Sequence, residues 1–383
     1  FIVVCLLNVK KYFISNYNKK FISAYNEDRI KIGIENLEKA IFLSPKNLTL
    51  IKHKAHAFSK NTLNINISSA NQNLLKINVS NRDSLNESKK ILQALLLKRP
   101  KDHEILHNLG WIFMSEEKFI EAENYFKKAL SLNSYIPEYQ CSLVLSKIAQ
   151  SQLQEAIIPL SKALQYSPDI LESRFYLELQ NKYSSIAKKA TLDAISNLKG
   201  KLKINENNPI YKARLARLLL IEDGKEALNL LTSINNNLPN LSRPWLYKGY
   251  LKTLVNDSIS ANQFFNKAKF LKYSDYLNYL YDGNYQEKIG NEKSAIENYE
   301  KVFDFYKSGA PSFYTPSWYG ISSIRNSLIP KELLYYIQPN LDNQRVFKYL
   351  KNYYRKSNDK KNAAKYDELF LKYQDRLFME KID

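Results

Sequence analysis

Glycine and cysteine are the scarce residues of this chain. It contains 9 glycines among 383 residues, which disfavours glycine-rich phosphate-binding loops and fits continuous helix. No Walker loop, dinucleotide-binding fingerprint, serine nucleophile elbow or paired-cysteine motif is present, and we expect no cofactor. The two cysteines, Cys5 and Cys141, stand far apart, so the sequence contains no disulfide framework. We expect Cys141 to be a small buried apolar residue.

Acidic residues are outnumbered by basic ones. The chain has 57 lysines and arginines against 38 aspartates and glutamates, a formal net charge of +19. Nucleic acid, an anionic membrane surface and acidic proteins are the usual partners of such a chain. The lysines are scattered without a long basic run, and the aromatic residues stand at repeat-core spacing. The sequence therefore disfavours nucleic-acid binding and favours an acidic protein or peptide as partner.

Two 34-residue blocks stand head to tail between His103 and Ile170. In the first block, apolar and small residues mark two successive helical faces: Leu106, Leu109, Gly110 and Phe113, then Ala122, Phe126, Ala129 and Leu130. The second face returns 34 residues later as Ala156, Leu160, Ala163 and Leu164. A fixed period with two short amphipathic helices per unit is typical of a helical solenoid.

The same period returns further along the chain. Gly249 and Gly283 are 34 residues apart, and so are Ala261 and Ala295. We expect these small residues to lie where the two helices of a unit approach closely, with aromatic side chains such as Trp245 filling the remaining space. The period therefore predicts helix hairpins well beyond the first two blocks.

The spacing of leucine, glycine, aromatic residue, alanine and proline resembles the tetratricopeptide repeat (TPR). The resemblance implies an all-α fold, a right-handed superhelical solenoid of two-helix repeats. It also implies a concave face, lined by the first helices, that holds a protein or peptide. The carboxylate clamp of one TPR subclass is absent, because its places carry other residues: His107 and Trp111, Cys141 and Leu145, Lys212 and Ala216. The resemblance thus favours a non-enzymatic scaffold or adaptor that does not bind chaperone tails.

Composition divides the chain into five stretches. Residues 1–11 read as the end of a membrane anchor, and 12–60 as degenerate repeats. Residues 61–84 are rich in Asn and Ser and read as a loop-like insertion. Residues 85–309 form the TPR solenoid. Residues 310–383 read as an irregular linker followed by capping helices, the last of them polar on one face.

The N-terminal stretch has two interpretations. Phe1 to Leu7 is apolar and is followed by Lys10 and Lys11, which is how membrane spans end, although seven residues cannot span a bilayer. The other interpretation is an apolar N-terminal turn that packs on the first repeat, and we favour the membrane anchor. A membrane anchor that runs into a loose repeat array resembles the TPR-bearing tail of O-antigen ligase-like membrane proteins. The alternative assignment is therefore the soluble TPR portion of such a larger membrane enzyme or assembly. With an anchor, the repeat array would lie in the cytoplasm or in the periplasm, and its lysines favour the cytoplasm. Without an anchor, we expect the array in the cytoplasm.

Two histidine pairs could bind a metal. His103-Glu104-Ile105-Leu106-His107 matches the HExxH pattern, in which two histidines share zinc and the glutamate is a general base. The other interpretation is the first turn of a repeat helix capped by Asp102. We favour that interpretation and expect no metal, which leaves a zinc hydrolase as a remote alternative. His53 and His56 have no evident partner ligands.

A binding groove is expected on the first helices. The repeat register predicts eight residues on its inner surface: Trp111, Met114, Leu145, Ile148, Arg243, Leu246, Tyr250 and Glu287. The alternative is that the apolar members pack against the next repeat. Arginine and tyrosine are frequent anchors of protein interfaces, so Arg243 and Tyr250 are the strongest candidates for partner contact.

Overall fold

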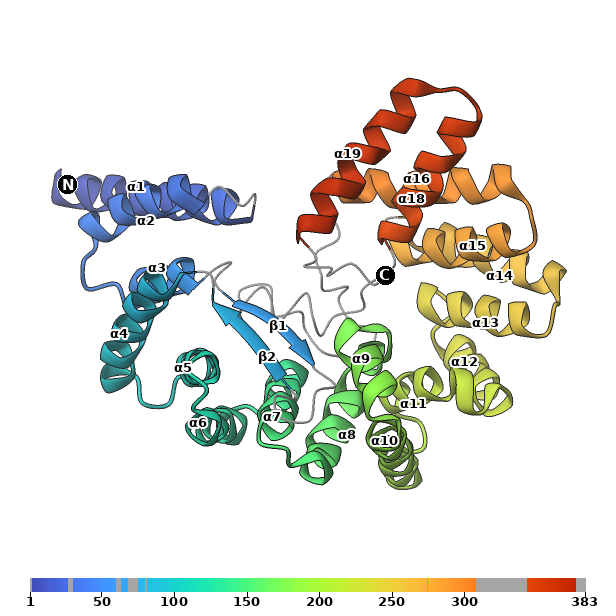
Figure 1. Ribbon diagram of the computed structural model, residues 1–383, viewed down its shortest axis with the longest axis horizontal. Coiled ribbons are helices and arrows are strands. Elements are labelled where there is room, and N and C mark those ends of the chain that lie inside the picture. Colours follow the sequence, from blue (N-terminus) through green and yellow to red (C-terminus); the bar gives the residue numbers. More distant parts are fainter. Residues whose placement is uncertain are drawn as a thin grey trace. The chain divides into compact units, whose positions relative to one another are not determined.

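The computed structural model describes residues 2–26, 30–59, 63–67, 75–79, 81–273, 275–307 and 343–376. Apart from a β hairpin, they form antiparallel helix pairs, and successive pairs within a unit pack on one another, as the sequence predicted (Figure 1). The all-α solenoid of two-helix repeats is thereby confirmed. The chain divides into two compact units, with the boundary between Pro159 and Leu160.

Unit 1 contains three complete helix pairs and the first helix of another. Its elements are α1 (Ile2–Asn26), α2 (Ile30–Leu43), α3 (Leu48–Ser59), β1 (Leu63–Ile67), β2 (Leu75–Val79), α4 (Arg82–Lys98), α5 (His103–Ser115), α6 (Phe119–Leu132), α7 (Pro137–Ala149) and the 3-10 turn η1 (Leu153–Ala156).

Unit 2 begins inside α8 (Ile157–Tyr166). Its further elements are η2 (Pro168–Glu172), α9 (Arg174–Lys182), α10 (Ser184–Ile204), α11 (Pro209–Glu222), α12 (Gly224–Asn237), α13 (Ser242–Leu254), α14 (Ser258–Leu271), α15 (Tyr276–Lys288), α16 (Glu292–Lys307), α18 (Asn343–Lys356) and α19 (Lys360–Arg376).

Polar side chains cap the N-terminal ends of several first helices. The Asp102 carboxylate accepts hydrogen bonds from the backbone N–H groups of Glu104 and Ile105 at the start of α5. Asn208 caps α11 in the same way, and Asp275 caps α15. A cap satisfies backbone donors that have no partner inside the helix, so these residues fix where each repeat begins.

One turn geometry recurs between first and second helices. A residue with positive φ follows the first helix at Glu117, Ser151, Asn256, Gly290 and Asn358, with φ between 57° and 77°. This left-handed conformation ends one helix and redirects the chain into the next. Its presence between α18 and α19 shows that the last helix pair is built like a repeat.

Three glycines let paired helices meet. A Cβ atom on Gly110 would lie 2.5 Å from the Phe126 ring, and one on Gly249 would lie 2.7 Å from the Phe265 ring. Gly283 faces Tyr299 at the same 2.7 Å. No real Cβ tolerates such distances, so each glycine is required by the aromatic ring opposite it. The sequence prediction for these positions is confirmed.

The insertion between α3 and α4 is not a loop throughout. β1 and β2 pair antiparallel within it, with Leu63 opposite Val79 and Ile65 opposite Ile77. The alternation of apolar residues with Asn and Lys in Leu63–Ile67 and Leu75–Val79 is the period of a strand. The high Asn and Ser content of residues 61–84 obscures that alternation in the sequence. β2 lies beside α5 and α7, two first helices of unit 1 (Figure 1).

The N-terminal helix packs as a member of the first repeat. Phe21 on α1 joins Leu37 and Ala40 on α2 and Leu50 on α3 in one buried cluster. In the described part of the chain, no helix combines the length and apolarity needed to cross a bilayer. The side chains of residues 2–7 and all of residues 308–342 lie outside what the structure describes, and the predicted anchor and linker fall partly on them.

Candidate functional site: the first-helix face of unit 2

The first helices of unit 1 keep their predicted groove residues inside. Trp111, Met114, Leu145 and Ile148 are each at most 1% exposed. The β hairpin lies on this side, because β2 runs beside α5 and α7. These four side chains therefore belong to the packing of the repeats, the alternative considered for them, and they offer no surface to a partner in this structure.

A hydrogen-bond network lies in the same packing. The Ser142 hydroxyl donates to the Glu138 carbonyl oxygen at 2.9 Å and accepts from Trp111 Nε1 at 2.9 Å. His107 Nε2 lies 2.8 Å from the same hydroxyl, so it donates as well, and the imidazole is neutral. Burial lowers the pKa of His107 well below its ordinary value, in agreement with that assignment.

The HExxH residues do not converge on one point. His107 is completely buried on Ser142, whereas His103 Nδ1 lies 2.8 Å from the Tyr139 hydroxyl. Glu104 forms an ion pair with Lys52. The described residues contain no group of three metal-ligating side chains. The arrangement is that of a capped repeat helix and does not fit a zinc site.

The predicted groove residues of unit 2 fall into two classes. Leu246 is fully buried, and Arg243 is 5% exposed. Tyr250 on α13 and Glu287 on α15 are part-exposed, and Glu287 accepts a hydrogen bond from the Tyr299 hydroxyl. Of the predicted residues in unit 2, only Tyr250 and Glu287 present substantial surface.

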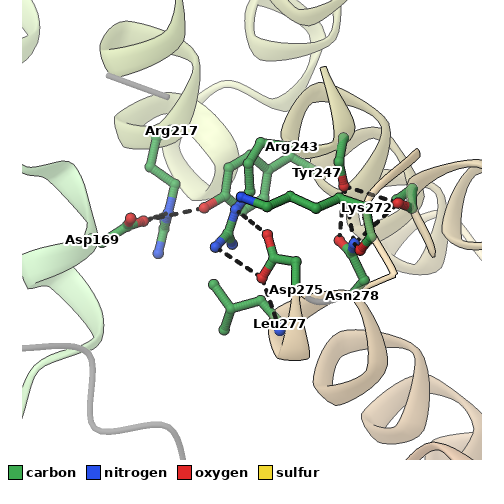
Figure 2. A network of polar contacts seen from close by, with 10 residues as sticks. Asp169, Arg217, Arg243, Tyr247, Lys272, Asp275, Leu277 and Asn278 are labelled. Atoms are coloured by element: carbon green, nitrogen blue, oxygen red, sulfur yellow. Dashed lines mark hydrogen bonds and ion pairs between the residues drawn. The ribbon is translucent and has the colours of Figure 1, made fainter. Parts of the chain in front are cut away.

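Arg243 is held in an ion pair. Its Nε lies 3.1 Å from Asp275 Oδ2, and its Nη2 donates to Asp275 Oδ1 at 3.2 Å (Figure 2). Asp275 also caps α15 through the backbone N–H of Leu277. Asp275 is 3% exposed, so both charges are desolvated, and the attraction of Asp275 raises the pKa of Arg243 against the effect of burial. The pair ties α13 to the start of α15 and is not free to bind an acidic ligand.

A second polar group, the inner polar cluster, consists of Asp169, Glu172, Arg217, Tyr247 and Tyr281. Arg217 on α11 is 3% exposed and contacts two carboxylates of η2, with Nε 2.9 Å from Asp169 and Nη2 2.5 Å from Glu172. The Tyr247 hydroxyl donates to Asp169 at 3.1 Å (Figure 2), and the Tyr281 hydroxyl donates to Glu172. The cluster connects η2 with α11, α13 and α15.

Burial and charge fix the protonation of the cluster. Burial raises the pKa of Tyr247 and Tyr281, and the nearby carboxylates raise it further, so both remain hydrogen-bond donors. Burial disfavours the charge on Arg217, but Glu172 and Asp169 raise its pKa above the ordinary value. The cluster is therefore a charged network at neutral pH, with the arginine behind the tyrosines.

An aromatic pair forms the accessible front of this cluster. The rings of Tyr250 and Tyr281 meet edge to face, with centroids 5.6 Å apart, and both side chains are part-exposed. Asn284 is exposed one turn beyond Tyr281, and the Glu172 side chain is 36% exposed beside them. A partner that reaches this face meets tyrosine rings, an amide and a carboxylate, while the arginines stay behind them.

The 34-residue period does not point to Arg217, because the register of one repeat is shifted. A strict 34-residue period places Ala216 opposite Tyr250. Counted from the caps, Arg217 follows Asn208 by nine residues, as Tyr250 follows Leu241. The Asn208-Pro209 start of α11 was the available signal. Nothing in the sequence indicated that Asp169 and Glu172 would face it.

Proteins similar to this chain are found among solved structures. No family model and no curated protein matches the chain. Among solved structures it is similar to YrrB, a TPR protein with an unusual peptide-binding site, with 17% identity, a TM-score of 0.26, and coverage of 49% of this chain and 95% of that one. It is also similar to MamA from Desulfovibrio magneticus RS-1, with 17% identity, a TM-score of 0.26, and coverage of 54% and 97%.

A third similar structure covers more of the chain. It is a tetratricopeptide repeat protein from Parabacteroides merdae, with 13% identity, a TM-score of 0.35, and coverage of 84% of this chain and 98% of that one. The resemblance to O-antigen ligase-like proteins stays a prediction. By its helix pairs, recurring turns and glycine–aromatic contacts, the chain has a TPR-like repeat fold.

Proposed function

We propose that this chain is a non-enzymatic scaffold or adaptor that binds a protein or peptide on the first-helix face of unit 2. The observation that carries the proposal is the part-exposed pair of Tyr250 and Tyr281, backed by the inner polar cluster. Tyrosine offers a large contact area with few rotatable bonds, and it is enriched among residues that dominate binding energy.

The cluster behind the pair fixes its geometry. The Tyr281 hydroxyl is held by Glu172, and Glu172 is held by Arg217, so one ring of the pair is locked from behind. A side chain that is already ordered loses little entropy on binding. This face therefore favours a partner with an apolar or aromatic anchor that packs on the two rings, and with a donor group for the part-exposed Glu172.

Long-range attraction selects among such partners. The net charge of +19 draws an acidic protein toward the chain, although the arginines at this face are already paired. Rim charges act mainly on the association rate, and salt screens them. We expect binding to an acidic partner whose association slows at high salt while the contact with Tyr250 persists.

Partner capture tests the proposal. The full chain is immobilised and exposed to extract of the source organism, and each captured protein is purified and titrated. Tyr250→Ala is expected to weaken binding by about 2 kcal/mol, or about thirtyfold. The matched control is Tyr273→Ala, which removes a 60% exposed tyrosine beyond α14. Equal affinities of wild type and Tyr250→Ala for every partner would contradict the proposal.

A further inference from the structure

The most exposed large apolar side chains share one position in the repeat. Among the described residues these are Ile204 at 90%, Leu97 at 87%, Phe42 at 85% and Phe270 at 81%. Each is the last or next-to-last residue of the second helix of a pair, in α10, α4, α2 and α14. Single exposed apolar residues are common on protein surfaces, but recurrence at one repeat position is not expected from chance.

Lysines surround these side chains in unit 1. Lys39 and Lys46 are exposed around Phe42, and Lys98 and Lys101 are exposed around Leu97. The carboxylates nearest in sequence are engaged elsewhere, since Glu38 pairs with Lys54, and Asp102 pairs with Lys52.

Lysines also neighbour the exposed side chains of unit 2, where the exposed Glu206 follows Ile204 by two residues. Lys203 directly precedes Ile204 and is exposed. Lys267 lies over the Phe270 ring, with its Nζ 5.5 Å from the ring centroid. A helix C-terminus attracts lysine through its dipole, but the dipole gives no reason for an exposed phenylalanine or isoleucine beside it. We call these helix ends, with Phe42 and Leu97 in unit 1 and Ile204 and Phe270 in unit 2, the basic edge of each unit.

The opposite turns provide a contrast. Consecutive helices run antiparallel, so the turn from a first to a second helix lies at the other end of the pair. Ile120, Ile221 and Ile259 are 66%, 77% and 76% exposed near these turns. Acidic residues neighbour them in the chain, namely Glu117 and Glu121, Glu222 and Asp223, and Asp257, and the nearby Lys118 pairs with Glu116. The two ends of the helix pairs thus differ in charge and not in apolar exposure.

We propose that the basic edge of each unit docks on an anionic membrane surface, with Phe42, Leu97, Ile204 and Phe270 inserted among the lipid headgroups. Apolar side chains that enter the interface and lysines that meet anionic lipid are the two components of peripheral membrane binding. A protein partner would need a contiguous apolar patch, whereas these four side chains stand at the ends of separate helices, with Phe42 in a hollow that Phe13, Tyr17 and Leu43 also line. Leucine and isoleucine cannot stack on bases, which disfavours nucleic acid.

The test is sedimentation of the full chain with vesicles of phosphatidylcholine alone and of an equal mixture of phosphatidylcholine and phosphatidylglycerol. The edge variant carries Phe42→Ser, Leu97→Ser, Ile204→Ser and Phe270→Ser. The matched control carries Ile120→Ser, Ile221→Ser and Ile259→Ser, at similarly exposed sites on the acidic ends. All of these side chains are largely solvated, so both variants are expected to fold, which helical circular dichroism checks.

Wild type and the control are expected to sediment with the phosphatidylglycerol vesicles and to stay free of pure phosphatidylcholine. The edge variant is expected to bind at least about tenfold more weakly. Equal binding by edge variant and control, binding independent of phosphatidylglycerol, or no binding by wild type would each overturn the proposal. Oligonucleotide binding that the edge substitutions abolish, without vesicle binding, would assign the edge to nucleic acid instead and overturn it as well.

Discussion

Tyr281 donates its hydroxyl hydrogen to Glu172, a residue that precedes it by three whole helix pairs, α9–α10, α11–α12 and α13–α14. In a solenoid each repeat usually contacts only its neighbours, so stability is close to a sum of local terms. This bond, together with the ion pair of Glu172 and Arg217, links non-adjacent elements of unit 2. We expect the elements it connects to unfold together.

Removal of Arg217 tests that coupling. Arg217→Met leaves Asp169 and Glu172 without their shared cation, and breaking a buried ion pair costs about 3–5 kcal/mol. Because Glu172 is about a third exposed, we expect about 3 kcal/mol, the lower end of that range. Arg355→Met is the control, since its ion pair with Asp367 is largely solvated and should be worth under about 1 kcal/mol. Equal losses in thermal melts of the two variants would contradict the assigned role.

Two glycine substitutions should act in opposite directions. A Cβ on Gly249 would meet the Phe265 ring, so Gly249→Ala is expected to destabilise by about 1–3 kcal/mol through overpacking. Gly200 lies inside α10 with no atom within 4 Å of such a Cβ, so Gly200→Ala is expected to stabilise by about 0.5–1 kcal/mol. Urea unfolding of both variants gives the two signs. A stable Gly249→Ala protein would show that the helices do not meet there.

Acid should weaken unit 1 through Glu123. Burial works against its charge, but hydrogen bonds from Lys127, Lys147 and Gln150 lower its pKa from 4.5 to about 2. A carboxyl whose pKa falls on folding contributes stability above the unfolded pKa, and that contribution is lost as pH falls from about 5 toward 2. We expect Glu123→Gln to lose less stability than wild type over this range, measured by unfolding at each pH. Parallel pH profiles would contradict this prediction.

Zinc should not bind the HExxH segment. His107 is buried on Ser142, and His103 is held by Tyr139, so ligation would require both to leave their partners. We expect no stoichiometric zinc in purified protein and no change in the melting curve with a chelator. One-to-one zinc binding that His103→Gln abolishes would restore the hydrolase alternative.

The 34-residue period predicted the helix pairs because the contacts within each pair join residues that are close in sequence. Gly249 and Phe265 lie in one helix pair and meet by sequence spacing alone, so their contact follows from the pattern. The strands at Leu63–Ile67 and Leu75–Val79 carried an equally local signal that the Asn content obscured. The helix pairs and the β hairpin could therefore be predicted from the sequence.

The candidate site was less accessible to sequence reasoning. Tyr250 was predicted on the first-helix face and is part-exposed there. Trp111 was predicted on the same face by the same rule and is buried, because its ring packs against Phe126 and donates to Ser142 of the next helix pair. The contact of Glu172 with Tyr281 depends on how successive repeats curve, which no residue pattern within one repeat specifies.

Site-specific photo-crosslinking tests the central claim most directly. A benzoylphenylalanine residue replaces Tyr250 in one variant and Tyr273 in another, and each full-length protein is irradiated with a captured partner. We expect a covalent adduct from position 250 and none from position 273, where the tyrosine is 60% exposed in the turn between α14 and α15. Adducts from position 273 with none from position 250 would show that the partner binds elsewhere.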